Sequence, residues 1–305
     1  MSATSDTTTS PTCHSTGEHR PLARIVVRQL IPLALVLFLA TLVFGALLVH
    51  HYQQWADAAA LRDHVGNHAY HFGRYPHDAH NTTATLLADG KRIAFLPALC
   101  AAAITGLLTG GEWGTRRFAL TLAQTVSARR WFAARWTGLA VLFTALLLPL
   151  VMLYRFTVVH AFDLDLLTYG VDRQTVYFTV GPVTVAYLLL GVAAGALTGT
   201  ALRRTWPSFV AAPALTWLVA AVLVRSRAAL LLDFPAYSEV HGMHGGGVLG
   251  LQFYDLLPTD SYVLNSLQPG DYWPYQLAES TLVVTVAALF ALVAFRTLRR
   301  RTGQP

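Results

Sequence analysis

Charged residues are scarce in this chain. Only 12% of its 305 residues are Asp, Glu, Lys or Arg, whereas 54% are hydrophobic. Several apolar runs approach the ~20 residues that a helix needs to cross a bilayer. This balance excludes an ordinary soluble protein and indicates a multi-pass membrane protein.

Lysine and cysteine are also rare. The only lysine, Lys91, stands in Ala-Asp-Gly-Lys-Arg, which lacks the glycine pattern of a phosphate-binding loop. The chain therefore has no nucleotide site and no catalytic residue that we can identify, and any ATP it uses must be bound by another chain. Cys13 lies in a polar stretch and Cys100 in an apolar run, so the pair indicates neither a disulfide nor a zinc knuckle.

Charge is nearly absent from the interiors of the apolar runs. The exceptions, Arg155 and Glu279, lie near predicted outer ends, where they either extend to the interface or line a gate. A proton-coupled carrier usually keeps a carboxylate or histidine at mid-membrane, and many carriers contain internal repeats. Neither is found here, which disfavours a secondary transporter.

The apolar runs predict an all-α polytopic fold with six transmembrane helices. Residues 1–20, rich in Ser and Thr, predict a disordered cytoplasmic tail, and residues 21–305 form one domain. The predicted spans cover residues about 27–50, 93–110, 137–159, 177–202, 207–224 and 277–295, with outer loops at 51–92 and 225–276.

The distribution of charge predicts the topology. With both termini cytoplasmic, most of the 22 basic residues lie inside and most of the 16 acidic residues outside, as the positive-inside rule requires. The net charge of +6 is thereby explained without nucleic acid. Trp113, Trp131 and Trp136 then fall at the inner interface as an aromatic belt. An arginine-rich composition with little lysine indicates a bacterial protein, hence a plasma membrane location.

Residues 111–135, between the second and third predicted spans, form the coupling segment. It contains five arginines and a single acid, Glu112. Phe118, Leu122 and Val126 recur every four residues, which predicts an apolar stripe on a short cytoplasmic helix. Ser127 is a candidate N-cap for the next helix. The alternative is a basic loop that only fixes topology.

Two further patterns stand out. Gly191, Gly195 and Gly199 share one face of the fourth span, where they predict close approach of another helix. Three histidines, His64, His68 and His71, would share one face of a helix and could chelate a metal. Their run is HVGNH rather than HExxH, so no hydrolase motif is present, and solvated loop histidines are the ordinary alternative.

Several motifs together resemble the permease subunits of type-2 ATP-binding-cassette (ABC) transporters, the actinobacterial branch in particular. They are Glu112-Trp-Gly-Thr115, Gln124-Thr-Val-Ser-Ala-Arg-Arg-Trp131, the Arg203-Arg-Thr205 end of the fourth span, and Trp273-Pro-Tyr-Gln-Leu-Ala-Glu279. Gly110 and Ala128 depart from the family pattern, which has Glu and Arg at those positions.

The resemblance implies a coupling helix that an ATPase subunit grips, and an outer gate. The implied ATPase contacts are Glu112, Gly114, Thr115, Phe118, Leu122, Gln124, Val126, Ser127, Arg129 and Arg130. The implied outer gate consists of Trp273, Gln276 and Glu279.

The resemblance also implies partners and an activity. Two permease copies, or one copy and a sibling, would assemble in the bilayer with ATPase subunits that bind ATP and Mg²⁺. The expected function is export of an amphipathic small molecule, peptide or lipid, without enzymatic activity in this chain. Two alternatives stay open: a metal-dependent membrane enzyme that uses the outer histidines, and a membrane sensor or immunity protein.

Overall fold

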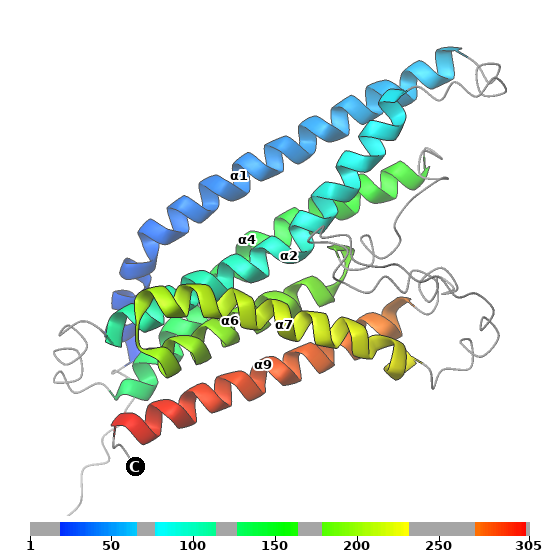
Figure 1. Ribbon diagram of the computed structural model, residues 1–305. Coiled ribbons are helices and arrows are strands. Elements are labelled where there is room, and N and C mark those ends of the chain that lie inside the picture. Colours follow the sequence, from blue (N-terminus) through cyan, green and yellow to red (C-terminus); the bar gives the residue numbers. More distant parts are fainter. Residues whose placement is uncertain (1–18, 66–76, 114–126, 164–178, 232–271, 303–305) are drawn as a thin grey trace, which may run out of the picture.

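The computed structural model describes residues 19–65, 77–113, 127–163, 179–231 and 272–302, which are almost entirely helical. Six helices in this part of the chain are long and apolar enough to span a membrane, so the prediction of six spanning helices is confirmed. They are α1 (His19–Val65), α2 (His77–Trp113), α4 (Ala128–Asp163), α6 (Pro182–Leu202), α7 (Thr205–Leu231) and α9 (Tyr272–Thr302) (Figure 1).

The helix α6 lies at the centre of the bundle. It packs against α2, α7 and α9, and 72% of its spanning stretch is buried inside the protein. In contrast, α1 packs mainly against α4 and diverges from α6, α7 and α9 (Figure 1). Its large apolar side chains, such as Leu35 and Phe38, are more than half exposed, as expected for a surface that faces lipid or another membrane subunit.

The helices extend well beyond the predicted spans. The helix α1 continues to Val65 and α2 already begins at His77, so most of the loop predicted at 51–92 is helical, which corrects that expectation. Hydropathy indicates where a helix crosses lipid, whereas a polar helix outside the lipid gives no such signal. Likewise α7 continues to Leu231 and α9 begins at Tyr272; the rest of the predicted outer loop 225–276 lies outside the described residues.

Glycines bring the backbones of α6 and α2 together. A Cβ added at Gly195 would lie 2.5 Å from the Ala102 carbonyl oxygen and 2.7 Å from Thr105 Cβ. At Gly199 it would lie 2.5 Å from Thr109 Cβ, and at Gly191 it would overlap the Ala98 carbonyl. Only glycine fits at these three positions, so the face predicted from their four-residue spacing contacts α2.

The same helix α2 approaches α7 through two other glycines. A Cβ at Gly106 would lie 2.7 Å from the Ser208 carbonyl oxygen, and one at Gly110 would lie 2.7 Å from the Arg204 carbonyl oxygen. Consequently α2, α6 and α7 form a unit in which backbone meets backbone. We call these three helices the glycine-packed unit.

The predicted inner aromatic belt is wrong for two of its members. Trp131 and Trp136 are 7% and 6% exposed, and both belong to the main hydrophobic cluster of the protein. Trp136 packs edge-on against Phe295 of α9, with ring centroids 4.7 Å apart, and its Nε1–H donates to Thr109 Oγ1 at 3.3 Å. Trp136 therefore joins α2, α4 and α9 in the interior, although both indoles stand at positions along the chain that are expected for an interface belt.

We expect Gly195→Ala to lower the free energy of unfolding by about 1–3 kcal/mol, because the added methyl group would collide with the α2 backbone. The matched control is Gly45→Ala in α1, where the added Cβ would lie 3.7 Å from Leu150 Cδ2, an ordinary contact. The control should be neutral or slightly stabilising. Denaturant titration of the purified protein measures both, and equal effects would contradict the close packing of α6 on α2.

Candidate functional site

The arginine-rich helix ends gather at one end of the bundle. This end includes the start of α1, the end of α2, the start of α4, the turn between α6 and α7, and the end of α9 (Figure 1). The coupling segment is attached here, because α2 ends at Trp113 and α4 starts at Ala128. Most of the expected ATPase contacts fall outside the described residues: Gly114, Thr115, Phe118, Leu122, Gln124 and Val126.

Ser127 starts α4. Its hydroxyl oxygen accepts from the backbone N–H of Arg130 at 3.4 Å, and its carbonyl oxygen accepts from the N–H of Trp131 at 3.1 Å. This is the N-cap predicted from the sequence. The cap places Arg129, which is half-buried, and Arg130, which is exposed, in the first turn of the helix.

An ion pair connects the two helices on either side of residues 114–126. Arg135 of α4 pairs with Glu112 near the end of α2, and the two side chains are only 11% and 19% exposed. The Arg135 guanidinium also lies 3.5 Å from the Gln29 Oε1 of α1. One cation therefore holds α1, α2 and α4 together where the coupling segment begins. The charge run at Arg129–Arg135 was visible in the sequence, but the partner at position 29 gave no local signal.

The last residue of α2 contacts the turn between α6 and α7. Arg203 ends α6 in the left-handed conformation (φ 54°), and its N–H donates to the Gly199 carbonyl at 3.2 Å. Its guanidinium lies 4.6 Å from the centre of the Trp113 ring, a cation–π contact. On the other side, Trp113 stacks on Phe132 of α4, with ring centroids 6.1 Å apart. The beginning of the coupling segment is thus in contact with both α4 and α6.

The expected outer gate residues lie at the opposite end, where α9 starts. Gln276 is fully buried, and its Oε1 accepts from the Val183 N–H at 3.3 Å. A Cβ at Gly181 would overlap the same amide. Glu279 accepts a hydrogen bond from the Tyr187 hydroxyl at 3.2 Å. Both side chains therefore bond α9 to α6. The third expected residue, Trp273, is half exposed.

A buried carboxylate at the far ends of α1 and α2 escaped sequence analysis. Asp89 is 3% exposed at its side chain, and its Oδ2 lies 2.6 Å from His51 Nδ1. Its Oδ1 accepts from Arg92 at 2.8 Å. The Asp89–Arg92 spacing is a recognisable helical pair, but His51 is 38 residues away in the chain. The cluster holds α2 to α1 near the ends of their apolar stretches.

The three histidines considered as candidate metal ligands have no described side chains. His68 and His71 lie outside the described residues, and His64 belongs to α1, without a described side chain. Among the described residues, no group of three or more His, Cys, Asp and Glu side chains could hold a metal ion.

We expect Glu112→Gln and Arg135→Gln each to destabilise the protein by about 3 kcal/mol, because each leaves a largely buried charge without its partner. The double variant should lower the free energy of unfolding by clearly less than the sum of the two single variants, since it leaves no charge without a partner. Denaturant titration of the four proteins measures this difference. Strict additivity of the single effects would show that the pair does not couple α2 to α4.

One comparison with known proteins identifies a family of membrane proteins. Residues 31–227 match the sequence profile of the family described as ABC-2 membrane transporter related. No curated protein and no solved structure matches the chain. Since the family match extends over more than half of the chain, the protein belongs to the ABC-2 membrane transporter related family.

Proposed function

We propose that the chain is the permease subunit of an ABC transporter, driven by a separate ATPase subunit that binds ATP and Mg²⁺ and grips the coupling segment. One observation carries this proposal. The two helices on either side of residues 114–126 belong to different parts of the bundle: α2 to the glycine-packed unit, and α4 to the pair it forms with α1. A displacement of the segment would therefore act on both parts.

The contacts between α2 and α4 next to residues 114–126 are suited to transmitting a movement of the segment to the bundle. The Glu112–Arg135 pair and the stacked Trp113 and Phe132 rings join α2 to α4 by side chains, which can rearrange. By contrast, the contacts of α2 with α6 are made by backbone at glycines, which leaves no space for one helix to shift toward the other. We infer that nucleotide binding moves the glycine-packed unit as a body relative to α1 and α4. Such a shift needs a partner that binds one arrangement better than the other.

The cargo that suits these spans is amphipathic, and we propose export. The spanning stretches have mean hydropathies of 1.6–2.7. The charged residues in the described spans lie toward the ends of these stretches, as Arg135, Arg155 and Glu279 do, and their central parts are uncharged. A path lined in this way favours a small molecule, peptide or lipid with a large apolar part. Two permease copies, or this chain and a sibling, would form the path, and the exposed apolar face of α1 is available for that contact.

Replacing Gly114 and Thr115 by Glu should abolish co-purification of the ATPase subunit while the protein still inserts in the membrane. The added charge and bulk would disturb the surface that the partner grips. The matched control is Thr205→Glu, which adds a carboxylate at the other turn at the same end of the bundle. An intact complex in the Gly114/Thr115 variant would refute the role of the coupling segment.

A cysteine placed at Thr121 in a variant without Cys13 and Cys100 should resist a membrane-impermeant thiol reagent added to intact cells, and react after permeabilisation. The reason is that the proposed topology places the coupling segment in the cytoplasm. A cysteine at Thr259, in the predicted outer loop 225–276, should react in intact cells and serves as the control. Labelling of the Thr121 variant from outside would overturn the topology and the ATPase contact with it.

A further inference from the structure

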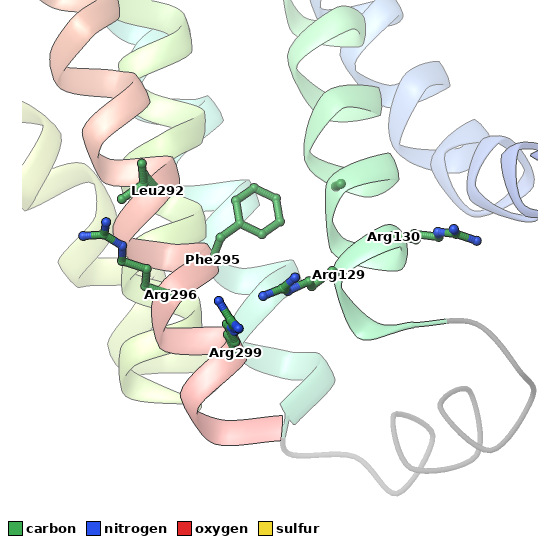
Figure 2. Close-up of a pocket in the computed structure, with 7 residues that line it drawn as sticks. Arg129, Arg130, Leu292, Phe295, Arg296 and Arg299 are labelled. Atoms are coloured by element: carbon green, nitrogen blue, oxygen red, sulfur yellow. The ribbon is translucent and has the colours of Figure 1, made fainter. Parts of the chain in front are cut away.

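An open pocket of about 410 Å³ lies between the start of α4 and the end of α9, at the arginine-rich end of the bundle (Figure 2). It does not involve the Glu112–Arg135 pair. Three residues of α4 and four of α9 line it: Arg129, Arg130, Ala133, Leu292, Phe295, Arg296 and Arg299.

The pocket has a charged level and an apolar level. On α9, Leu292 precedes Arg299 by seven residues, two helical turns, which places the two about 10 Å apart along the axis. Phe295 lies between them, with its ring directed toward α4 (Figure 2). Across the gap, Arg129 points toward α9 near the level of Arg299 (Figure 2). The guanidinium groups of Arg129 and Arg299 thus lie at the helix ends, and the apolar side chains lie deeper in the spanning stretch.

The charge of this pocket is not balanced by the residues that line it. Four arginines line it, and none of the described lining residues is acidic. Arg135, one to two turns further along α4, is paired with Glu112, whereas no carboxylate of the described residues forms an ion pair with Arg129 or Arg299. The Arg129 and Arg299 guanidinium groups lie near each other across the gap, whereas Arg130 points away from α9 (Figure 2). Like charges this close repel each other, so an anion bound between Arg129 and Arg299 would lower the energy of this arrangement.

We propose that the pocket binds the phosphate of an anionic phospholipid from the adjoining leaflet, with its acyl chains along Leu292 and Phe295. Arginine is well suited to phosphate because its planar guanidinium can donate two parallel hydrogen bonds. Basic pockets between transmembrane helices are known to receive lipid head groups. The arginines lie at the helix ends and the apolar side chains lie deeper in the membrane-spanning stretch. This is also the order in which a phospholipid places its phosphate and its acyl chains. In this proposal Arg129 contacts a lipid phosphate rather than the ATPase subunit.

The lipid joins two elements that otherwise touch little. The helices α4 and α9 make few contacts compared with α6 and α9, apart from the Trp136–Phe295 pair deeper in the bundle. A phosphate between Arg129 and Arg299 would connect α4 to α9 at their ends. The lipid would thereby stabilise one position of α4 relative to the glycine-packed unit, independently of the cargo and of the ATPase.

The test is titration of the purified full-length protein with phosphatidylglycerol and with phosphatidylcholine, followed by native mass spectrometry. Phosphatidylglycerol should bind preferentially, and the Arg129→Gln/Arg299→Gln variant should bind it about 10- to 30-fold more weakly, because two phosphate contacts are lost. Arg300→Gln, on the same exposed helix end but outside the pocket, should stay within about twofold of the unchanged protein. Glycerol 3-phosphate, which has the phosphate but no acyl chains, should bind weakly.

Four results would overturn the proposal. They are equal binding of the two lipids, an unchanged affinity in the pocket variant, an equal loss in Arg300→Gln, and glycerol 3-phosphate binding as tight as the lipid, which would indicate a soluble-anion site. If the pocket variant kept its lipid affinity but lost the ATPase, the arginines would serve the partner instead. Arg299→Lys keeps the charge and should retain the fold, so an intermediate affinity is expected even where the double variant is unstable.

Discussion

The close contact between the backbones of α6 and α2 is the constraint on which the rest of this bundle depends. Three glycines of α6 remove the side chains that would separate the two helices, and two glycines of α2 do the same toward α7. Without a hydrophobic driving force inside lipid, such close packing is a principal source of helix association. It gives α6 its buried position, and it leaves α1 and α4 to attach through larger side chains.

The contrast between these two kinds of contact suggests how the protein could move. Helices in backbone contact have one favourable arrangement, whereas interfaces made of aromatic rings and an ion pair can repack with modest cost. The Glu112–Arg135 pair and the Trp113, Phe132 and Trp136 rings lie at the boundary between the glycine-packed unit and α4. The coupling segment starts and ends at this boundary, which is where a small displacement would have the largest effect.

Local patterns in the sequence predicted the features that depend on local chemistry. Hydropathy located the six spans, the four-residue spacing located the glycine face, and Ser127 was recognised as a helix cap. Features that depend on distant residues were missed. Nothing near Asp89 indicates His51 as its partner, and the burial of Trp136 involves Phe295 of α9, which lies more than a hundred residues away in sequence. The length of α1 and α2 was missed because polar helical turns outside lipid resemble loop by composition.

The turn between α6 and α7 limits how these two helices can move relative to each other. Only Arg203 and Arg204 separate the two helices, and the N–H of Ser208 donates back to the Arg204 carbonyl at 3.2 Å. A connection this short cannot lengthen, so neither helix can slide along the other by even one turn. Alternating exposure of a transport path through this bundle would then require α6 and α7 to tilt together as an intact hairpin, pivoting at Arg203 and Arg204.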